Sequence, residues 1–299
     1  MRICAIDVGT NTVMSVVADV AGGRLEILAD EERFARLGQG VDASGRLAPE
    51  AMDRVVDRLA GALATADRLG AERVVVAATS ASRDASNVGE LQARVRAELG
   101  LDYRVISGAQ EASASFRGAL ALLPDLDAAL VVDIGGGSTE AALGTRHGGV
   151  GSRQSVDVGS VRLTERHFSA RPPSPEAVGR AQADAAAAYA AVAFERPADV
   201  PLVATGSVGR LVARLAEAER EVPLQAVEAW RDRLLALTPD QALAVAPDVL
   251  AGREDVAAAA LLLLAAALVR FGADAYVPTA GGLRHGLALE AADGTARGV

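Results

Sequence analysis

The 299-residue sequence contains no lysine, and all 30 of its basic residues are arginines. A phosphate-binding P-loop, which depends on a lysine, is therefore excluded. Any phosphate that this chain binds must be contacted by arginine side chains, by backbone N–H groups or by a metal ion. An alanine- and arginine-rich genome would produce the same bias, so the bias alone assigns no function.

Cysteine is nearly absent, and long apolar segments are missing. Cys4 is the only cysteine, which excludes an intrachain disulfide and a cysteine metal cluster, and it is expected to pack in the first strand. The longest apolar run, Val256 to Val269, has 14 residues and predicts a buried helix, because it is too short to span a bilayer. Asp7 interrupts the N-terminal apolar run too early for a signal peptide. We therefore expect a cytoplasmic protein without a membrane partner.

Charge and length indicate which partners and how many domains to expect. The net charge of −9 argues against a nucleic-acid partner, which would require a basic face. The apolar content of 51% and charged content of 23% are typical of a folded globular protein, and the length favours two domains. The three histidines, His147, His167 and His285, match no ligand spacing, so we expect none of them to be catalytic.

Strand-like and helix-like segments alternate along the chain. Three β-rich runs cover the N-terminus, and Gly22 and Gly23 join the last two as a predicted hairpin. The region from Pro49 to Leu69 has its apolar residues on one helical face, Asn87 is expected to cap a further helix, and Ser107 to open another. The order β-β-β-α-β-α-β-α describes residues 1 to about 122.

The second half repeats the beginning of the first. "ALVVDIGGGSTEAALG" matches "ICAIDVGTNTVMSVVAD": each has an apolar strand, an aspartate, a glycine, a small polar loop and a second strand. The two loops lie 126 positions apart. An internal repeat of this kind predicts two domains of similar structure.

The second of these loops has the composition of a phosphate-binding turn. Gly135, Gly136 and Gly137 let the backbone approach an anion, while Ser138 and Thr139 add hydroxyl donors. The short segment after the loop indicates a β-hairpin rather than the helix that a dinucleotide-binding motif requires. A tight turn without a ligand is the structural alternative for each loop. Two matched loops favour a ligand held in a cleft between duplicated domains.

These segments resemble the exopolyphosphatase/guanosine pentaphosphate phosphohydrolase (Ppx/GppA) family of the actin-like ATPase superfamily. "AIDVGTNT" and "VVDIGGGSTE" are similar to its two phosphate loops, and "RLGQGVDASGRL", "ATSASRDASN", "VISGAQEA", "VDVGSVRLTER" and "GGLRHGLALE" follow in the family's order. The segment "VATGSVGRL" is a looser match. The chain resembles a short form without the C-terminal helical domain that longer members carry.

The resemblance implies an α/β fold of two actin-like (ribonuclease H-like) domains with an interdomain cleft. Domain I would comprise residues 1–123 and 284–299 and carry the first loop and the catalytic glutamate, and domain II would comprise residues 124–283 and carry the second loop. It further implies phosphate binding by Gly9, Thr10, Asn11, Arg83, Gly135, Gly136, Gly137, Ser138 and Thr139.

Two glutamates are the catalytic candidates. The resemblance aligns Glu111 with the general base, although its place after Ser107 in a capping-box pattern also suits a residue that only complements the helix dipole. Glu140, which we expect at the start of a strand, could be an ordinary solvent-facing charge. The family comparison instead gives it a role in positioning the attacking water, with metal binding as the alternative.

Three carboxylates beside the loops are candidate metal ligands. Asp7, Asp133 and Glu140 supply oxygen atoms suited to Mg²⁺ or Mn²⁺ that is also bound by substrate phosphate, while capping of the turns is the alternative for the two aspartates. Arg83 suits bidentate phosphate binding, and an ion pair with Asp84 or Glu90 is its structural alternative.

Three functions fit this set of residues. A phosphoanhydride hydrolase acting on inorganic polyphosphate is preferred, with guanosine pentaphosphate as the other substrate considered. A kinase or ATPase would need an acceptor domain for which the chain has little room, and a nucleotide sensor would not need two carboxylates at the loop. The sequence leaves open whether the chain forms a homodimer.

Overall fold

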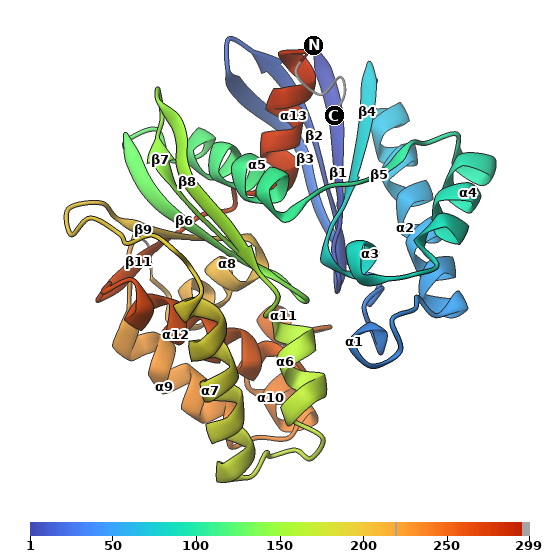
Figure 1. The fold of residues 1–299 in the computed structure, drawn as a ribbon. Coiled ribbons are helices and arrows are strands. Elements are labelled where there is room, and N and C mark those ends of the chain that lie inside the picture. The colour runs from blue at the N-terminus through green and yellow to red at the C-terminus, as the bar shows by residue number, and fades with distance from the viewer. Residues whose placement is uncertain (219, 295–299) are drawn as a thin grey trace. The chain divides into compact units, whose positions relative to one another are not determined.

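The computed structural model describes residues 1–218 and 220–294. The chain divides into two compact units. Unit 1 consists of Met1–Pro124 together with the chain from Gly281 onward, and unit 2 consists of Asp125–Ala280. Each unit contains one mixed sheet with helices packed against it (Figure 1). The predicted α/β class is therefore confirmed.

The sheet of unit 1 has the order β3-β2-β1-β4-β5. Its strands are β1 (Arg2–Val8), β2 (Thr12–Ala21), β3 (Arg24–Phe34), β4 (Arg73–Ala78) and β5 (Tyr103–Val105). The first three are antiparallel neighbours, and β4 and β5 run parallel to β1. The hairpin predicted at Gly22 and Gly23 joins β2 and β3, where both glycines have positive φ angles. The helices are α1 (Val41–Ser44), α2 (Pro49–Arg68), α3 (Ser80–Asp84), α4 (Val88–Leu99), α5 (Gly108–Ala121) and α13 (Leu283–Ala292).

The central strand β1 is buried on both faces because helices cover both sides of the sheet. Cys4 and Ile6 pack into the core under α2 and α4, whereas Ile3 and Ala5 point the other way, toward α5 and α13. This alternation follows from the twofold period of a strand. It explains why β1 is a nearly continuous apolar run, and it confirms the predicted packing of Cys4 in the first strand.

The sheet of unit 2 has the order β10-β11-β9-β6-β7-β8. Its strands are β6 (Ala128–Ile134), β7 (Thr139–Thr145), β8 (Gly149–Val156), β9 (Leu202–Thr205), β10 (Val222–Pro223) and β11 (Ala275–Pro278). Its helices are α6 (Ser160–His167), α7 (Pro175–Ala190), α8 (Gly206–Leu215), α9 (Leu224–Leu235), α10 (Pro239–Val245), α11 (Pro247–Leu250) and α12 (Ala257–Arg270). The predicted buried apolar helix is α12, which forms the middle of this core.

The internal repeat extends to the pairing of individual residues. Val8 pairs with Val13 across the first hairpin, and Ile134 pairs with Thr139 across the second. In each hairpin the first loop residue donates its backbone N–H to the carbonyl of the fourth over 2.9 Å. The two glycine loops are therefore the same turn built twice.

Two local predictions had different outcomes. The capping box at Ser107 is confirmed, because its side chain accepts from the Gln110 N–H and the Gln110 side chain accepts from the Ser107 N–H. Asn87 stands at the N-cap of α4 but does not cap it with its side chain. That side chain instead accepts from the Leu47 N–H at 2.8 Å and donates to the Leu47 carbonyl at 3.1 Å, tying a loop to the helix start.

Candidate active site

The first glycine loop, Gly9–Asn11, has its carbonyl groups bound from one side. The Thr10 carbonyl accepts from the Gly38 N–H at 2.8 Å, and the Asn11 carbonyl accepts from the N–H of Arg36 at 2.8 Å. Because the C=O and N–H of a trans peptide point in opposite directions, the N–H groups of Asn11 and Thr12 point away from that segment. Backbone N–H groups aligned in this way bind anions.

Thr10 adds a hydroxyl group to this loop. The residue is 6% exposed, and within the described part of the chain its Oγ1 atom has no hydrogen-bond partner. A buried polar atom without a partner costs free energy, about 1–3 kcal/mol. A phosphate oxygen bound at the loop would accept a hydrogen bond from this hydroxyl and remove that cost.

The second loop, Gly135–Ser138, is bound in the same way by the start of α6. The carbonyl of Gly135 accepts from the Ser160 N–H at 2.9 Å, that of Gly136 from the Val161 N–H at 2.8 Å, and that of Gly137 from Arg162 Nε at 2.7 Å. The peptide geometry then directs the N–H groups of Gly136, Gly137 and Ser138 away from α6. Three successive N–H groups on one side are suited to the oxygens of a phosphoryl group.

This arrangement requires a glycine at the start of α6. A Cβ atom on Gly159 would lie 2.4 Å from the Gly136 carbonyl carbon and 2.4 Å from the Gly137 nitrogen. Both contacts are with backbone atoms, which cannot move without distorting the loop. Gly159 and Arg162 are therefore part of the site's framework, although sequence reasoning did not single them out.

Arg83 and Glu111 form an ion pair within unit 1. Arg83 Nη1 lies 2.6 Å from Glu111 Oε2 and 3.1 Å from the Ile106 carbonyl, to which it also donates. Glu111 is only 7% exposed although it is in the first turn of α5. A residue that only complements the helix dipole would be solvated, so burial and the arginine contact set Glu111 apart from such a residue.

An ion pair with Asp84 or Glu90 was the structural alternative for Arg83. Glu90 pairs with Arg46 at 3.2 Å on an exposed surface. The observed pairing of Arg83 with Glu111 follows from β4 and β5, because their ends pair at Ala78 and Val105 and place the following segments side by side.

Glu140 is buried, which argues against the alternative that it is an ordinary solvent-facing charge. It is the second residue of β7 rather than the first, and it is 2% exposed. Ser155 on the neighbouring strand β8 donates its hydroxyl to Glu140 Oε1 over 2.6 Å. The residue opposite Glu140 on β6 is Asp133, so the two carboxylates project from the same face of the sheet.

Two aspartates hold equivalent places beside the loops. Asp7 and Asp133 are each the penultimate residue of their strands, β1 and β6. Asp133 and Glu140 supply oxygen ligands of the kind that Mg²⁺ prefers. Among the described residues, no group of three or more His, Cys, Asp or Glu side chains is arranged to bind a metal ion. A metal at this place would therefore also need ligands from substrate or water.

The structure thus groups the predicted site residues by unit. Unit 1 holds Asp7, the first loop and the Arg83–Glu111 pair, and unit 2 holds the second loop with Asp133 and Glu140. Sequence reasoning missed Ser155, Gly159 and Arg162. The segment that contains the last two, "VDVGSVRLTER", carried the signal as a family motif, but nothing in the sequence marked Ser155 as a partner of Glu140.

A model of the Ppx/GppA phosphatase family matches residues 16–294 of the chain. Exopolyphosphatase 2 of Mycobacterium tuberculosis is 44% identical over 191 residues, which are 60% of this chain and 59% of that protein. The guanosine-5'-triphosphate,3'-diphosphate pyrophosphatase of Vibrio cholerae is 34% identical over 167 residues, which are 56% of this chain and 33% of that protein. The matched part of the chain therefore spans less than two thirds of these curated relatives.

Solved structures are similar over nearly the full chain. An exopolyphosphatase from Cytophaga hutchinsonii gives a TM-score of 0.87 at 27% identity and covers 98% of both chains. The Aquifex aeolicus member of the Ppx/GppA family gives a TM-score of 0.80 at 27% identity and covers 100% of this chain and 99% of that one. The predicted actin-like fold is confirmed. That one substrate contacts both glycine loops stays a prediction.

Proposed function

Because the chain belongs to the Ppx/GppA phosphatase family, we propose that it is an exopolyphosphatase, a hydrolase that releases the terminal orthophosphate of inorganic polyphosphate. The more similar of the two relatives described above carries that name, and its identity to this chain is 44%. The observation that carries the proposal is Glu111, a buried carboxylate held by an arginine in the unit that also contains the first phosphate loop.

Glu111 acts as the general base in this proposal. It accepts a proton from a water molecule while the water oxygen attacks the terminal phosphorus. The bond from that phosphorus to the bridging oxygen breaks, which yields orthophosphate and a polyphosphate shorter by one unit. Arg83 favours the ionised carboxylate, the form that a base requires, and its guanidinium is a candidate for contacting the phosphoryl oxygens as well.

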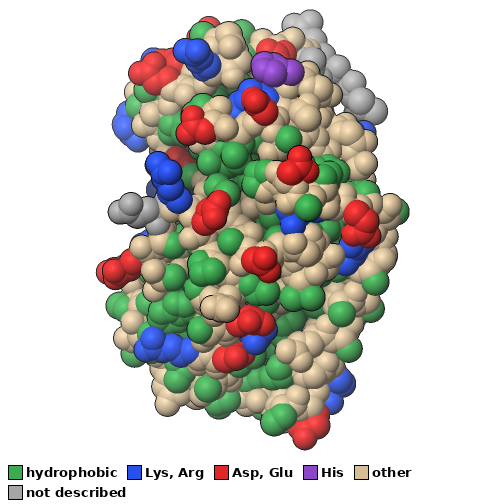
Figure 2. Space-filling model, turned by 90° about the vertical axis from the view of Figure 1, so that its left-hand side faces the viewer, with side chains coloured by type: hydrophobic (Ala, Val, Ile, Leu, Met, Phe, Trp, Pro, Cys, Tyr) green, Lys and Arg blue, Asp and Glu red, His purple; other side chains and the backbone are tan. Residues whose placement is uncertain are grey.

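The two glycine loops bind phosphoryl groups. Their N–H groups provide donors that carry no net charge, and the Thr10, Ser138 and Thr139 side chains add hydroxyl groups. The acidic net charge makes such local donors necessary, because the protein as a whole does not attract a polyanion. Figure 2 shows acidic and arginine side chains interspersed on the face that it draws.

We propose Mg²⁺ or Mn²⁺ as the cofactor, held by Asp133 and Glu140, with Asp7 as the equivalent carboxylate of unit 1. Mg²⁺ is usually bound by one or two carboxylates together with substrate phosphates, and the facing pair on β6 and β7 fits that pattern. When bound, the ion would neutralise charge on the phosphoryl oxygens. Ser155 holds Glu140 in position by its 2.6 Å hydrogen bond.

Guanosine pentaphosphate is the second candidate substrate. The Vibrio cholerae relative named for that type of substrate is 34% identical over its matched segment. Release of phosphate from long-chain polyphosphate, guanosine pentaphosphate and ATP, measured side by side with Mg²⁺, separates the alternatives. Turnover of polyphosphate above the other two is expected, and turnover of ATP alone would identify an ATPase or kinase instead.

The cellular location and the partners of the protein are part of the same proposal. Among the described residues no helix is both long and apolar enough to cross a bilayer. We propose a cytoplasmic protein that acts without membrane or nucleic-acid partners. A homodimer is a possibility that light scattering coupled to size-exclusion chromatography would test.

A further inference from the structure

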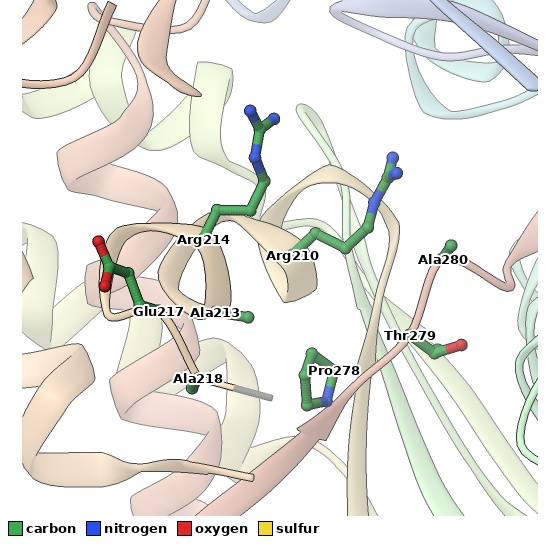
Figure 3. Close-up of a pocket in the computed structure, with 8 residues that line it drawn as sticks. All are labelled: Arg210, Ala213, Arg214, Glu217, Ala218, Pro278, Thr279 and Ala280. Atoms are coloured by element: carbon green, nitrogen blue, oxygen red, sulfur yellow. The ribbon is translucent and has the colours of Figure 1, made fainter. Parts of the chain in front are cut away.

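A cavity of about 350 Å³ lies in unit 2 between α8 and the chain that leaves β11. Figure 3 shows the side chains of Arg210 and Arg214 extending from α8 in the same direction, with Pro278, Thr279 and Ala280 on the opposite wall. The residues that line it are Arg210, Ala213, Arg214, Glu217, Ala218, Pro278, Thr279 and Ala280.

The cavity lies beside the carboxyl end of β11, at the edge of the sheet that also carries the second glycine loop. Strands β6, β9 and β11 are parallel neighbours, and Val132, Ala204 and Pro278 form one row across them. Two strand spacings separate the ends of this row, which is about 10 Å. Ligands of open α/β sheets bind outside the carboxyl ends of the strands, where both the loop and the cavity lie.

The polar groups in the cavity are mostly hydrogen-bond donors. Arg210 and Arg214 are one helical turn apart on α8 and so share a face. Arg214 Nη2 donates to the Asp248 carbonyl at 3.0 Å, and a guanidinium has further N–H groups with which to bind a ligand. Thr279 lines the opposite wall, where Figure 3 shows its hydroxyl turned away from the two arginines.

From this arrangement we infer a second phosphoryl subsite, in which Arg210 and Arg214 bind a phosphoryl group of the polyphosphate chain that lies beyond the one held by the Gly135–Ser138 loop. The inference rests on the proposed function, since it assigns a chain-length preference to the same site. Short phosphoanhydrides occupy the loop alone, and long ones reach the arginines.

The occupant is a phosphate chain rather than a nucleoside. Four of the lining residues are apolar, but none of the residues described as lining the cavity is aromatic, so none can stack on a base. Glu217, which is exposed in the turn after α8, also lines the cavity. Its carboxylate repels a polyanion, but it would accept hydrogen bonds from the N–H groups of a purine base. The two occupants therefore predict opposite effects of removing its charge.

The test compares a long-chain polyphosphate with tripolyphosphate in steady-state kinetics. Arg210→Gln and Arg214→Gln are each expected to lower the preference for the long chain, measured as the ratio of kcat/KM values, by about tenfold, because each removes a charge-assisted hydrogen bond. Glu217→Gln is expected to raise that ratio. The control is Arg180→Gln, since Arg180 is exposed on α7 and does not line the cavity.

An unchanged ratio in both arginine variants would overturn the subsite. A loss of guanosine pentaphosphate turnover in Glu217→Gln would overturn it in favour of a nucleoside pocket. If the wild-type protein hydrolyses neither substrate, the proposed function fails, and calorimetric binding of the long-chain polyphosphate then tests the subsite by itself. Weaker binding in both arginine variants, with unchanged melting temperatures, is expected, and equal binding in all variants overturns it.

Discussion

Arg83 Nη1 lies 2.6 Å from Glu111 Oε2, and both side chains are largely buried. This pair combines two residues that the sequence suggested for separate tasks, one for binding phosphate and one for accepting a proton. A carboxylate buried without a counter-charge would become protonated and could not act as a base. The arginine therefore makes the burial of Glu111 compatible with catalysis.

Glu111→Gln is expected to lower turnover by about two to four orders of magnitude, because glutamine is nearly isosteric but does not accept the proton. KM should hardly change, since the proposed function assigns substrate binding to the loops and not to Glu111. The matched control is Glu50→Gln, because Glu50 is also an acidic residue in the first turn of a helix, α2, but is exposed. Turnover, KM and melting temperature measured on the same preparation decide the outcome. Near-normal turnover in Glu111→Gln would transfer the base role to Glu140 or remove it.

The sequence predicted those parts of the fold that depend on local patterns. The repeat of "AIDVGTNT" in "VVDIGGGSTE" indicated two hairpins, and their residue pairing is indeed the same. The contact of Arg83 with Glu111 was not predictable in this way. It depends on the parallel pairing of β4 with β5, and no local pattern specifies which parallel strands become neighbours.

The partner of Glu140 was missed for a related reason. Ser155 lies opposite Glu140 because the register of β7 and β8 shifts between Leu143 and Gly144. A shift of one residue turns every following side chain to the other face of a sheet. The sequence does not show such a shift, so the hydrogen bond of Glu140 to Ser155 could not be predicted.

Gly159→Ala is expected to impair the second loop. The new Cβ would meet the backbone of Gly136 and Gly137 at 2.4 Å, so the loop has to move and its N–H groups lose their alignment. KM for polyphosphate should rise by about tenfold or more, as expected when charge-assisted hydrogen bonds are lost. The control is Gly179→Ala in α7, where a Cβ meets nothing within 4 Å. That change should leave kinetics intact and stabilise the helix by up to about 1 kcal/mol. Equal kinetics in the two variants would contradict the framework role of Gly159.

Removal of divalent metal is expected to abolish turnover. A polyanionic substrate beside Asp133 and Glu140 faces strong local repulsion unless a cation is present. Phosphate release measured in excess chelator, and again after addition of Mg²⁺ or Mn²⁺, tests this expectation. Because Asp133 and Glu140 face each other on β6 and β7, Asp133→Asn should raise the Mg²⁺ concentration required for half-maximal rate. Full activity in chelator would show that the carboxylates have another role.

Cys4 is expected to resist thiol reagents in the folded protein. Burial, with a smaller effect from the charge of Glu31, raises the pKa of its thiol from 9.0 to about 12. The thiolate is the reactive form, and the side chain is fully buried in β1, so alkylation at pH 8 should require unfolding.

The raised pKa of Cys4 also affects stability. Between pH 9 and 12 the unfolded chain loses the thiol proton while the folded chain keeps it. The free energy of unfolding should therefore fall as the pH rises through this range. Urea denaturation at pH 8 and pH 10 measures this change in the free energy of unfolding. The same measurement on Cys4→Ala gives the part that does not depend on the cysteine, and the difference between the two proteins is the contribution of Cys4. Rapid alkylation of the native protein at pH 8 would show instead that β1 opens readily.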